Sequence, residues 1–265
     1  MRIAGAQVLL TGSTGGLGRA LVRHLTQADA RLIVTGRAPD PLRDLAQASG
    51  AVPVVADLAE TDDVRRLAAR CADVDVLIAN AALPASGDLL EYREDELRRA
   101  VEVNLVSVLQ LVHLLAPRMV ARGRGHIVVV GSMSGKAATP ESALYTTTKF
   151  GLRGFALAIR HDLRRHGVGV SLVQPGFVAD AGMFAATGAP LPRGATAVRA
   201  DRVAIAVLRA IETGRAEVNV APLALRAWCA LYGVSPRLAD GWRRLRSGAP
   251  DPAPRMIVDA QRARR

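Results

Sequence analysis

The residues best suited to chemistry are a tyrosine and a lysine four positions apart. Tyr145 and Lys149 form the segment Y-T-T-T-K, in a stretch with helical character. Residues at i and i+4 share one face of a helix, so the lysine ammonium would lie beside the phenol. A nearby positive charge favours the phenolate and lowers the phenol pKa from its ordinary value of about 10. The pair therefore predicts a general acid/base that works near neutral pH.

A serine completes this candidate catalytic group. Ser132 precedes Tyr145 by 13 residues and directly follows a short apolar run, and its hydroxyl could hold a substrate carbonyl oxygen. Ser134 offers a second hydroxyl in the same S-M-S segment, and we favour Ser132. The chain has only three tyrosines and two lysines, so a chance Tyr–Lys pair at this spacing is improbable. The alternative is a Tyr–Lys pair that packs on a helix surface.

A glycine-rich turn near the N-terminus predicts a phosphate site. The apolar run 7–10 leads directly into T-G-S-T-G-G-L-G, and a helical pattern follows at once. Glycines in such a turn let the backbone approach a pyrophosphate, whose charge is favoured at a helix N-terminus. The spacing differs from G-x-G-x-x-G, and no Lys-Ser/Thr pair makes it a nucleotide-binding Walker loop. The alternative is an ordinary strand–helix turn. The residues expected to contact the cofactor here are Gly12, Ser13, Thr14, Gly16, Leu17 and Gly18.

Apolar runs alternate with helical patterns along the first 220 residues. Several runs are apolar throughout, as in parallel strands covered on both faces. This alternation predicts an α/β fold, a Rossmann-like doubly wound parallel sheet of about seven strands, whose ligands bind beyond the carboxyl ends of the strands. We expect strands at 7–10, 31–35, 52–55, 74–79, 126–130, 168–173 and 217–220, and helices at 17–28, 41–48, 61–70, 94–122, 142–165 and 201–213.

At these motifs the chain resembles the short-chain dehydrogenase/reductase family, over roughly residues 4–221. The resemblance implies that Ser132, Tyr145 and Lys149 are catalytic, and that Lys149 also binds the nicotinamide ribose. Asn104, in V-N-L, resembles a fourth catalytic member that helps to hold a water between the lysine and solvent. Taken without the resemblance, Asn104 would be a satisfied polar residue within a helix.

Three further segments are similar to the family's cofactor-binding segments. Asn80-Ala81-Ala82 resembles N-N-A-G but departs from it at Ala79 and Ala82, and that segment props the sheet in the family. Asp57 and Leu58 match a pair that contacts adenine, with a turn or helix-capping role as the alternative for Asp57. Pro175-Gly176, with Val178 after it, matches the segment near the nicotinamide. The residues implied in cofactor binding are therefore Asp57, Leu58, Asn80, Ala81, Pro175, Gly176 and Val178.

The end of the second strand decides between NADP and NAD. NAD enzymes usually place a carboxylate there, on the ribose 2′-hydroxyl, and it would repel a 2′-phosphate. By the resemblance, Gly36 stands at that position and Arg37 follows. A guanidinium pairs bidentately with phosphate, so we predict NADP(H) as the cofactor. With NAD(H) as the alternative, Arg37 would stack on adenine or face solvent.

The segment after the sixth strand departs from the family. The family often has a threonine four residues after Gly176, close to the carboxamide, where this chain has Asp180. That difference puts the cofactor contact in question. Residues 177–200 correspond to the family's substrate lid and include Met183, Phe184 and Leu191. An apolar lid suits an apolar substrate.

Composition limits the possible classes of protein. Half of the 265 residues are hydrophobic, enough to bury the core of one α/β domain. Two cysteines, Cys71 and Cys229, make no disulfide framework and favour a reducing compartment. No secretory signal is visible, and residues 101–120 carry too many polar groups for a membrane span. We therefore expect a cytoplasmic protein, and no metal site is expected.

The net charge of +11 suggests nucleic-acid binding, but a simpler origin is favoured. Nearly all basic residues are arginines, as in a bias across the whole composition, and neither interleaved aromatics nor a recognition motif accompanies them. From Arg237 onward eight arginines face three aspartates. We expect a solvated basic tail, with contact to an anionic membrane surface as the alternative.

The expected domain organisation is a dinucleotide-binding and catalytic domain over 1–221 and a helical extension with a basic tail over 222–265. Two short helices are expected within 222–245, and the Pro-rich stretch 248–254 is expected to be irregular. The two helices could close the substrate pocket, extend an interface or lie on a membrane surface. In the family the helices of Asn104 and Tyr145 pack against a partner subunit, so a homodimer or homotetramer is expected. The alternative is that the apolar run 105–115 only covers the sheet.

The expected function is hydride transfer between NADP(H) and a carbonyl or alcohol substrate. Tyr145 would give the oxygen its proton in reduction and take it back in oxidation. The alternative is a catalytically silent protein that senses NADP(H) on the same fold. Intact Ser132, Tyr145 and Lys149 favour the enzyme, because a sensor needs no acid/base group.

Overall fold

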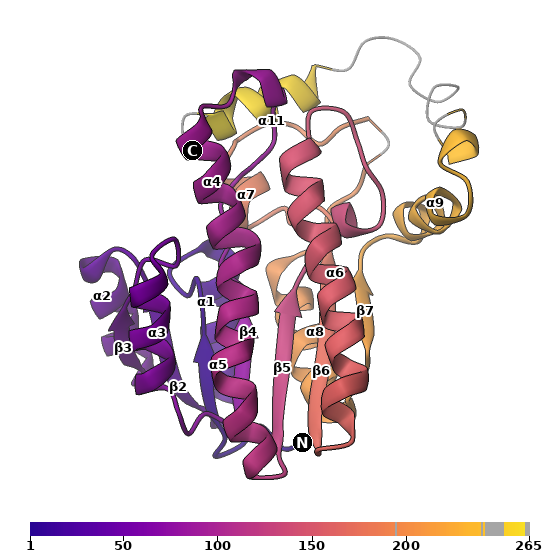
Figure 1. Ribbon diagram of the computed structural model, residues 1–265. Helices are drawn as coiled ribbons and strands as arrows, with labels where there is room; N and C mark the ends of the chain where they lie inside the picture. Colours follow the sequence, from indigo (N-terminus) through magenta and orange to yellow (C-terminus); the bar gives the residue numbers. More distant parts are fainter. Residues whose placement is uncertain (194, 240, 242–251, 263–265) are drawn as a thin grey trace.

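Seven short strands form one parallel sheet in the computed structural model, which describes residues 1–193, 195–239, 241 and 252–262 (Figure 1). The strand order is β3-β2-β1-β4-β5-β6-β7, so the direction of winding reverses between β1 and β4. This is the predicted doubly wound sheet. The strands are β1 Gln7–Leu10, β2 Arg31–Gly36, β3 Val52–Val55, β4 Val76–Ala79, β5 Gly125–Val130, β6 Val168–Pro175 and β7 Glu217–Val220.

Helices cover both faces of the sheet because the central strands are apolar on both sides. Leu9, Leu77 and Ile127 belong to the core cluster that contains residues of α3, α5 and α6. Val8 and Val76 point to the opposite face, in the cluster with residues of α1 and α8. The helices on the two faces are α1 Gly16–Gln27, α2 Pro39–Ser49, α3 Thr61–Arg70, α5 Ser107–Ala121, α6 Ala143–Arg164 and α8 Ala200–Thr213.

The long helix expected at 94–122 is interrupted. It consists of α4 Glu94–Val101, a π-helical turn Glu102–Val106 and α5. Over the described residues, Glu94–Ala121 is the one helical stretch whose length and composition would suit a membrane span, but half of its most apolar window is buried inside the protein. Leu111, Val112 and Leu115 on α5 cover the sheet as part of its core.

The C-terminal part differs from the prediction. The first expected helix is α9, Leu223–Val234, and the second lies partly outside the described residues. The stretch 248–254 was expected to be irregular, and that was wrong for Ala253 and Pro254, because they begin the helix α11 Ala253–Arg262. Proline is tolerated in the first turn of a helix, whose N–H groups have no partner within the helix. Residues 248–251 lie outside the described residues.

Helix α11 lies over the edge of the sheet at which the strands end. Figure 1 shows it across that end of the molecule, close to the start of α4 and to the short helix α7 Gly182–Ala185. Arg262 on α11 forms an ion pair with Glu91 in the single helical turn Leu89–Glu91, with 3.3 Å between Nη1 and Oε2. Chain segments more than 150 positions apart are thereby joined beside the carboxyl ends of the strands.

Candidate active site

A cavity of about 490 Å³ opens at the carboxyl edge of the sheet. Its walls come from the segments that follow β1, β2, β3, β4, β5 and β6, together with residues of α4, α6, α7, α9 and α11. It therefore lies beside β1 and β4, where the winding reverses. Sheets of this type bind their ligands at that position.

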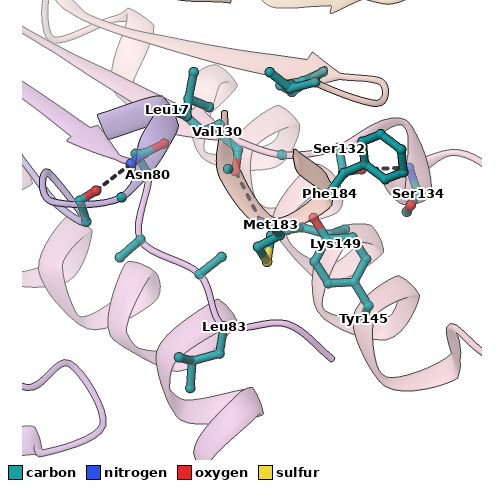
Figure 2. Close-up of a pocket in the computed structure, with 18 of the residues that line it drawn as sticks. Leu17, Asn80, Leu83, Val130, Ser132, Ser134, Tyr145, Lys149, Met183 and Phe184 are labelled. Carbon is teal, nitrogen blue, oxygen red and sulfur yellow. Dashed lines mark hydrogen bonds between the residues drawn. The ribbon is translucent and has the colours of Figure 1, made fainter. Parts of the chain in front are cut away.

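Ser132, Tyr145 and Lys149 all line this cavity (Figure 2). Tyr145 lies in the first turn of α6 and Lys149 one turn later, with Nζ 5.5 Å from the centre of the phenol ring. The Lys149 ammonium donates to the carbonyl oxygen of Val130, the last residue of β5, at 3.3 Å. The Ser132 hydroxyl oxygen accepts the backbone N–H of Ser134 at 3.1 Å, and this contact orients the serine side chain.

Burial controls the pKa values of the Tyr–Lys pair. It raises the pKa of Tyr145 to about 12, against a smaller lowering by a hydrogen-bonding interaction with Ser132. It also lowers the pKa of Lys149 to about 8, because a buried ammonium loses its hydration. The phenol pKa was predicted to lie below its ordinary value, and that was wrong, because burial raises it. With these values the phenol keeps its proton at neutral pH.

The glycine turn lies close to the end of β4. The backbone of Gly12 has a φ of +64°, and a Cβ there would lie 2.7 Å from the Cα of Ala81. The Thr11 hydroxyl oxygen accepts the backbone N–H groups of Asn80 and Ala81, each at 3.0 Å, and the Asn80 amide donates to the Thr11 carbonyl at 3.0 Å. These contacts fix the turn against the sheet. Asn80 thus holds the turn as well as lining the cavity.

The start of α1 is a cradle suited to a phosphate. A Cβ on Gly16, its first residue, would lie 2.4 Å from the backbone nitrogen of Gly182. The backbone of Gly182 packs against this position and leaves no room for a side chain, while Gly15, Gly16 and Gly18 line the cavity. Backbone N–H groups and the helix dipole favour a pyrophosphate at such a place. The residues present fit a dinucleotide cofactor here.

Most of the predicted site residues line the cavity, but Ser13 and Asn104 do not. Ser13 is fully buried, and its hydroxyl donates to the carbonyl oxygen of Thr35 in β2 at 3.0 Å. Its side chain therefore joins the turn after β1 to β2 instead of facing a cofactor. The predicted cofactor residues that line the cavity are Gly12, Thr14, Gly16, Leu17, Gly18, Arg37, Asp57, Leu58, Asn80, Ala81, Tyr145, Lys149, Pro175, Gly176 and Val178.

Asn104 is buried in the π-helical turn and clamps a neighbouring loop. Its amide oxygen accepts the N–H of Leu83 at 2.6 Å, and its amide nitrogen donates to the Leu83 carbonyl at 3.0 Å. The side chain is thus occupied by the segment that follows β4. Leu83 itself lines the cavity, so Asn104 acts on the site through the position of this loop.

Two arginines lie at the end of the cavity formed by β2 and β3. Arg37 follows β2 and forms no ion pair within the described residues. Arg99, on α4, donates to the Asp57 carboxylate at 2.8 Å. Burial alone would raise the pKa of Asp57, but hydrogen bonds from Arg99 and the backbone, with the charges of Arg99 and Arg37, lower it below its ordinary value. Arg99 was not predicted, because its sequence neighbours do not show that α4 returns to this edge.

Asp180 points away from the cavity. Its carboxylate accepts the N–H of Ala200, the first residue of α8, at 2.8 Å, and lies 3.6 Å from the guanidinium of Arg199. The departure from the family at this position thus supplies a cap for α8. Asp180 does not line the cavity, whereas its neighbours Ala181 and Gly182 do.

We therefore expect Asp180→Ala to affect stability more than cofactor binding. Loss of the cap leaves an N–H group at the start of α8 without its partner, which costs about 1 kcal/mol of the free energy of unfolding. The affinity for NADPH should change less than about threefold, because no contact to the cavity is removed. Urea unfolding and cofactor titration measure the two quantities. A tenfold loss of affinity at unchanged stability would contradict this assignment.

Comparisons with known proteins agree with this geometry. The family model described as short chain dehydrogenase matches residues 6–191. The chain is 32% identical over 227 residues to the ketoacyl reductase HetN of Nostoc sp., covering 82% of this chain and 79% of that protein. It is also 32% identical over 254 residues to dehydrogenase/reductase SDR family member 7B of Danio rerio, covering 85% and 82% of the two chains.

Solved structures of similar proteins contain the predicted cofactor. A short chain dehydrogenase from Burkholderia cenocepacia in complex with NADP superposes with a TM-score of 0.78 at 28% identity, over 94% of this chain and all of that one. A short-chain dehydrogenase from Sphingobium yanoikuyae in complex with NADPH superposes with a TM-score of 0.75 at 25% identity, over 89% and 95% of the two chains.

Proposed function

The chain belongs to the short-chain dehydrogenase/reductase family, and we propose that it transfers a hydride between NADP(H) and a small carbonyl or alcohol substrate. The observation that carries the proposal is the content of one cavity: Ser132, Tyr145 and Lys149 line the same space as the glycine turn and Arg37. Acid/base groups and a dinucleotide cradle are the two parts that such a reaction needs.

In the proposed reaction the protein supplies alignment and a proton. The bound NADPH provides the hydride, which is chemistry that no side chain can replace. The Ser132 hydroxyl holds the carbonyl oxygen, and Tyr145 gives that oxygen its proton as the alcohol forms. A phenol with a pKa of about 12 is protonated at neutral pH and so is ready to act as the acid in carbonyl reduction. Lys149 places a positive charge beside this proton transfer.

The choice of NADP(H) over NAD(H) as the cofactor rests on Arg37. It lines the cavity directly after β2, where Gly36 has no carboxylate to repel a 2′-phosphate. A guanidinium without an ion-pair partner can bind a phosphate in bidentate fashion. Two solved relatives contain NADP or NADPH, which supports the same choice.

Arg37→Ala should reduce the affinity for NADPH by about tenfold to a hundredfold, since a charge-assisted hydrogen bond contributes about 1.5–3 kcal/mol. The affinity for NADH should stay within about twofold, because NADH has no 2′-phosphate. Arg43→Ala is a control, because Arg43 is exposed and pairs with Asp40 on α2. Equal losses for both cofactors in Arg37→Ala would show that Arg37 does not read the 2′-phosphate.

The reaction is tested by NADPH consumption with a panel of aldehydes and ketones. We expect oxidation of NADPH that depends on the carbonyl compound, and formation of the corresponding alcohol. NADPH binding without turnover on any member of a broad panel would favour the silent sensor.

A further inference from the structure

One residue of the cavity wall comes from a helix that the reaction above does not use. Gln261, on α11, lines the cavity although its side chain belongs to the last described turn of that helix. It is 7% exposed. Its amide oxygen is buried and has no hydrogen-bond partner among the described residues.

The pattern of α11 shows that Gln261 departs from the rest of its buried face. Ala253 and Val258 are the other buried residues of this helix, and Arg255 and Asp259 lie on its exposed side. An apolar residue at position 261 would complete the face at no cost in hydrogen bonding. A buried amide without a partner destabilises the folded chain, so its presence calls for a partner that the fold does not provide.

The cavity supplies the place for such a partner. The wall contributed by α7 and α9 includes the apolar side chains of Met183, Phe184 and Leu225, and Phe184 stacks edge-on against Phe177 with 5.0 Å between ring centres. Figure 2 shows Met183 and Phe184 beside the catalytic group. A substrate that fills this part of the cavity would be largely apolar, and Gln261 is a polar group in the wall of the same cavity.

One contact outside the cavity supports the position of α11. The ion pair between Arg262 and Glu91 anchors the residue next to Gln261 onto the turn before α4. The helix thus holds the amide at the cavity wall before substrate arrives, as a specificity contact requires. Gln261 thus offers a bound molecule a contact from an element that carries none of Ser132, Tyr145 and Lys149.

We propose that Gln261 is a specificity-determining residue, and that its amide oxygen accepts a hydrogen bond from a hydroxyl group that an otherwise apolar carbonyl substrate carries in addition to the carbonyl. A hydroxyl fits because it can donate to the amide oxygen, the atom of Gln261 that has no partner among the described residues. The identification of the bound molecule as a substrate rests on the proposed carbonyl reduction. The hydrogen bond between Gln261 and a hydroxyl does not depend on that reaction, so the test measures binding and turnover separately.

The test compares straight-chain 2-alkanones of increasing length with the matching ω-hydroxy-2-alkanones. Dissociation constants are measured by calorimetry with the NADP⁺ complex, and kcat/KM with NADPH. We expect at least a tenfold preference for the hydroxy compound at one chain length in both quantities, because a site built to bind a hydroxyl discriminates strongly against its absence. The preference should vanish at shorter lengths.

Two variants locate the contact. Gln261→Leu should reduce the preference to within about twofold while leaving the affinity for NADPH unchanged, and should unfold in urea no earlier than the wild type. Asp259→Ala, on the exposed side of the same helix, should keep the full preference. A Gln261→Leu chain that retained the preference would overturn the proposal.

If Gln261→Leu does not fold, measurements of the two ketone series with the wild-type chain still test the proposal. Equal affinities and equal kcat/KM values for the two series at every length would overturn the role of Gln261 and leave the proposed function standing. A preference in binding without any turnover would support the role of Gln261 and contradict the proposed function. If neither series bound or reacted, both would be contradicted.

Discussion

Tyr145→Phe should reduce kcat/KM for carbonyl reduction by about a hundredfold to ten-thousandfold, the range that general acid catalysis contributes. The variant removes only the hydroxyl that supplies the proton. The ring remains in the small cluster with Ala85, Ala100 and Leu144, so folding should be preserved. The affinity for NADPH should change less than about threefold, since the glycine turn is untouched. Steady-state kinetics and cofactor titration of the same preparation give both results.

Tyr232→Phe is the matched control for this experiment. Tyr232 lies on α9, where its ring is 5.7 Å from that of Trp228, and it does not line the cavity. Loss of its hydroxyl should leave turnover within about twofold of the wild type. Normal turnover in Tyr145→Phe would contradict the role of Tyr145 as the acid/base. It would also contradict the proposal that this cavity is the site of the reaction.

Lys149→Met should have two large effects of opposite sign. Turnover should fall by at least about a hundredfold, because the positive charge beside the phenol is lost. Stability should rise, because burial lowers the pKa of Lys149 from 10.5 to about 8, so that holding the ammonium inside the folded chain costs about 3 kcal/mol. The unpaired Val130 carbonyl left behind costs about 1 kcal/mol. A net gain of about 2 kcal/mol at pH 7 is expected in urea unfolding.

The pH dependence of this gain has a defined direction. The protonated lysine destabilises the folded chain, because its pKa falls from 10.5 in the unfolded chain to about 8 in the folded one. The stability of the wild type therefore falls as the pH is lowered from 10.5 through about 8. The variant's advantage over the wild type should therefore be full below pH 8 and shrink between pH 8 and 10.5. Tyr145, with its pKa raised to about 12, acts in both chains above pH 10 and does not affect the difference.

The second lysine provides the contrast. Lys136 pairs with Glu217 at 3.0 Å, and both side chains are largely buried. Lys136→Met leaves that carboxylate without one of its partners, so the variant should lose about 1 kcal/mol or more of stability. If Lys149→Met lost as much stability as Lys136→Met, the expected gain would be contradicted. The buried ammonium of Lys149 would then have stabilising contacts beyond its hydrogen bond to Val130.

Local patterns were enough to predict the sheet and the Tyr–Lys pair that lines the cavity. The strands at Gln7–Leu10 and Val52–Val55 were predicted with their observed bounds, because a short apolar run marks each of them. Val52–Val55 is the edge strand β3, in which Val52 and Val55 are exposed, so its apolar run does not reflect cover on both faces. Tyr145 and Lys149 were found together because one turn of helix joins them. In both cases the information lies within a few adjacent residues.

What was missed depends on contacts between distant segments. Arg99 and Gln261 reach the cavity only because α4 and α11 return to the carboxyl edge of the sheet, which no periodicity reports. The Pro-rich start of α11 was taken for irregular chain. The shift in the pKa of Tyr145 was predicted in the wrong direction because burial, which depends on the whole fold, raises it by more than Ser132 lowers it.

The central claim, that this cavity holds NADP(H), is tested most directly by titrating the purified protein with NADPH and then with NADH while following cofactor fluorescence. The account predicts micromolar binding of NADPH and binding of NADH at least tenfold weaker, from the glycine turn and Arg37 together. A preference for NADH would contradict the role of Arg37. Failure to bind either cofactor would contradict the proposed function.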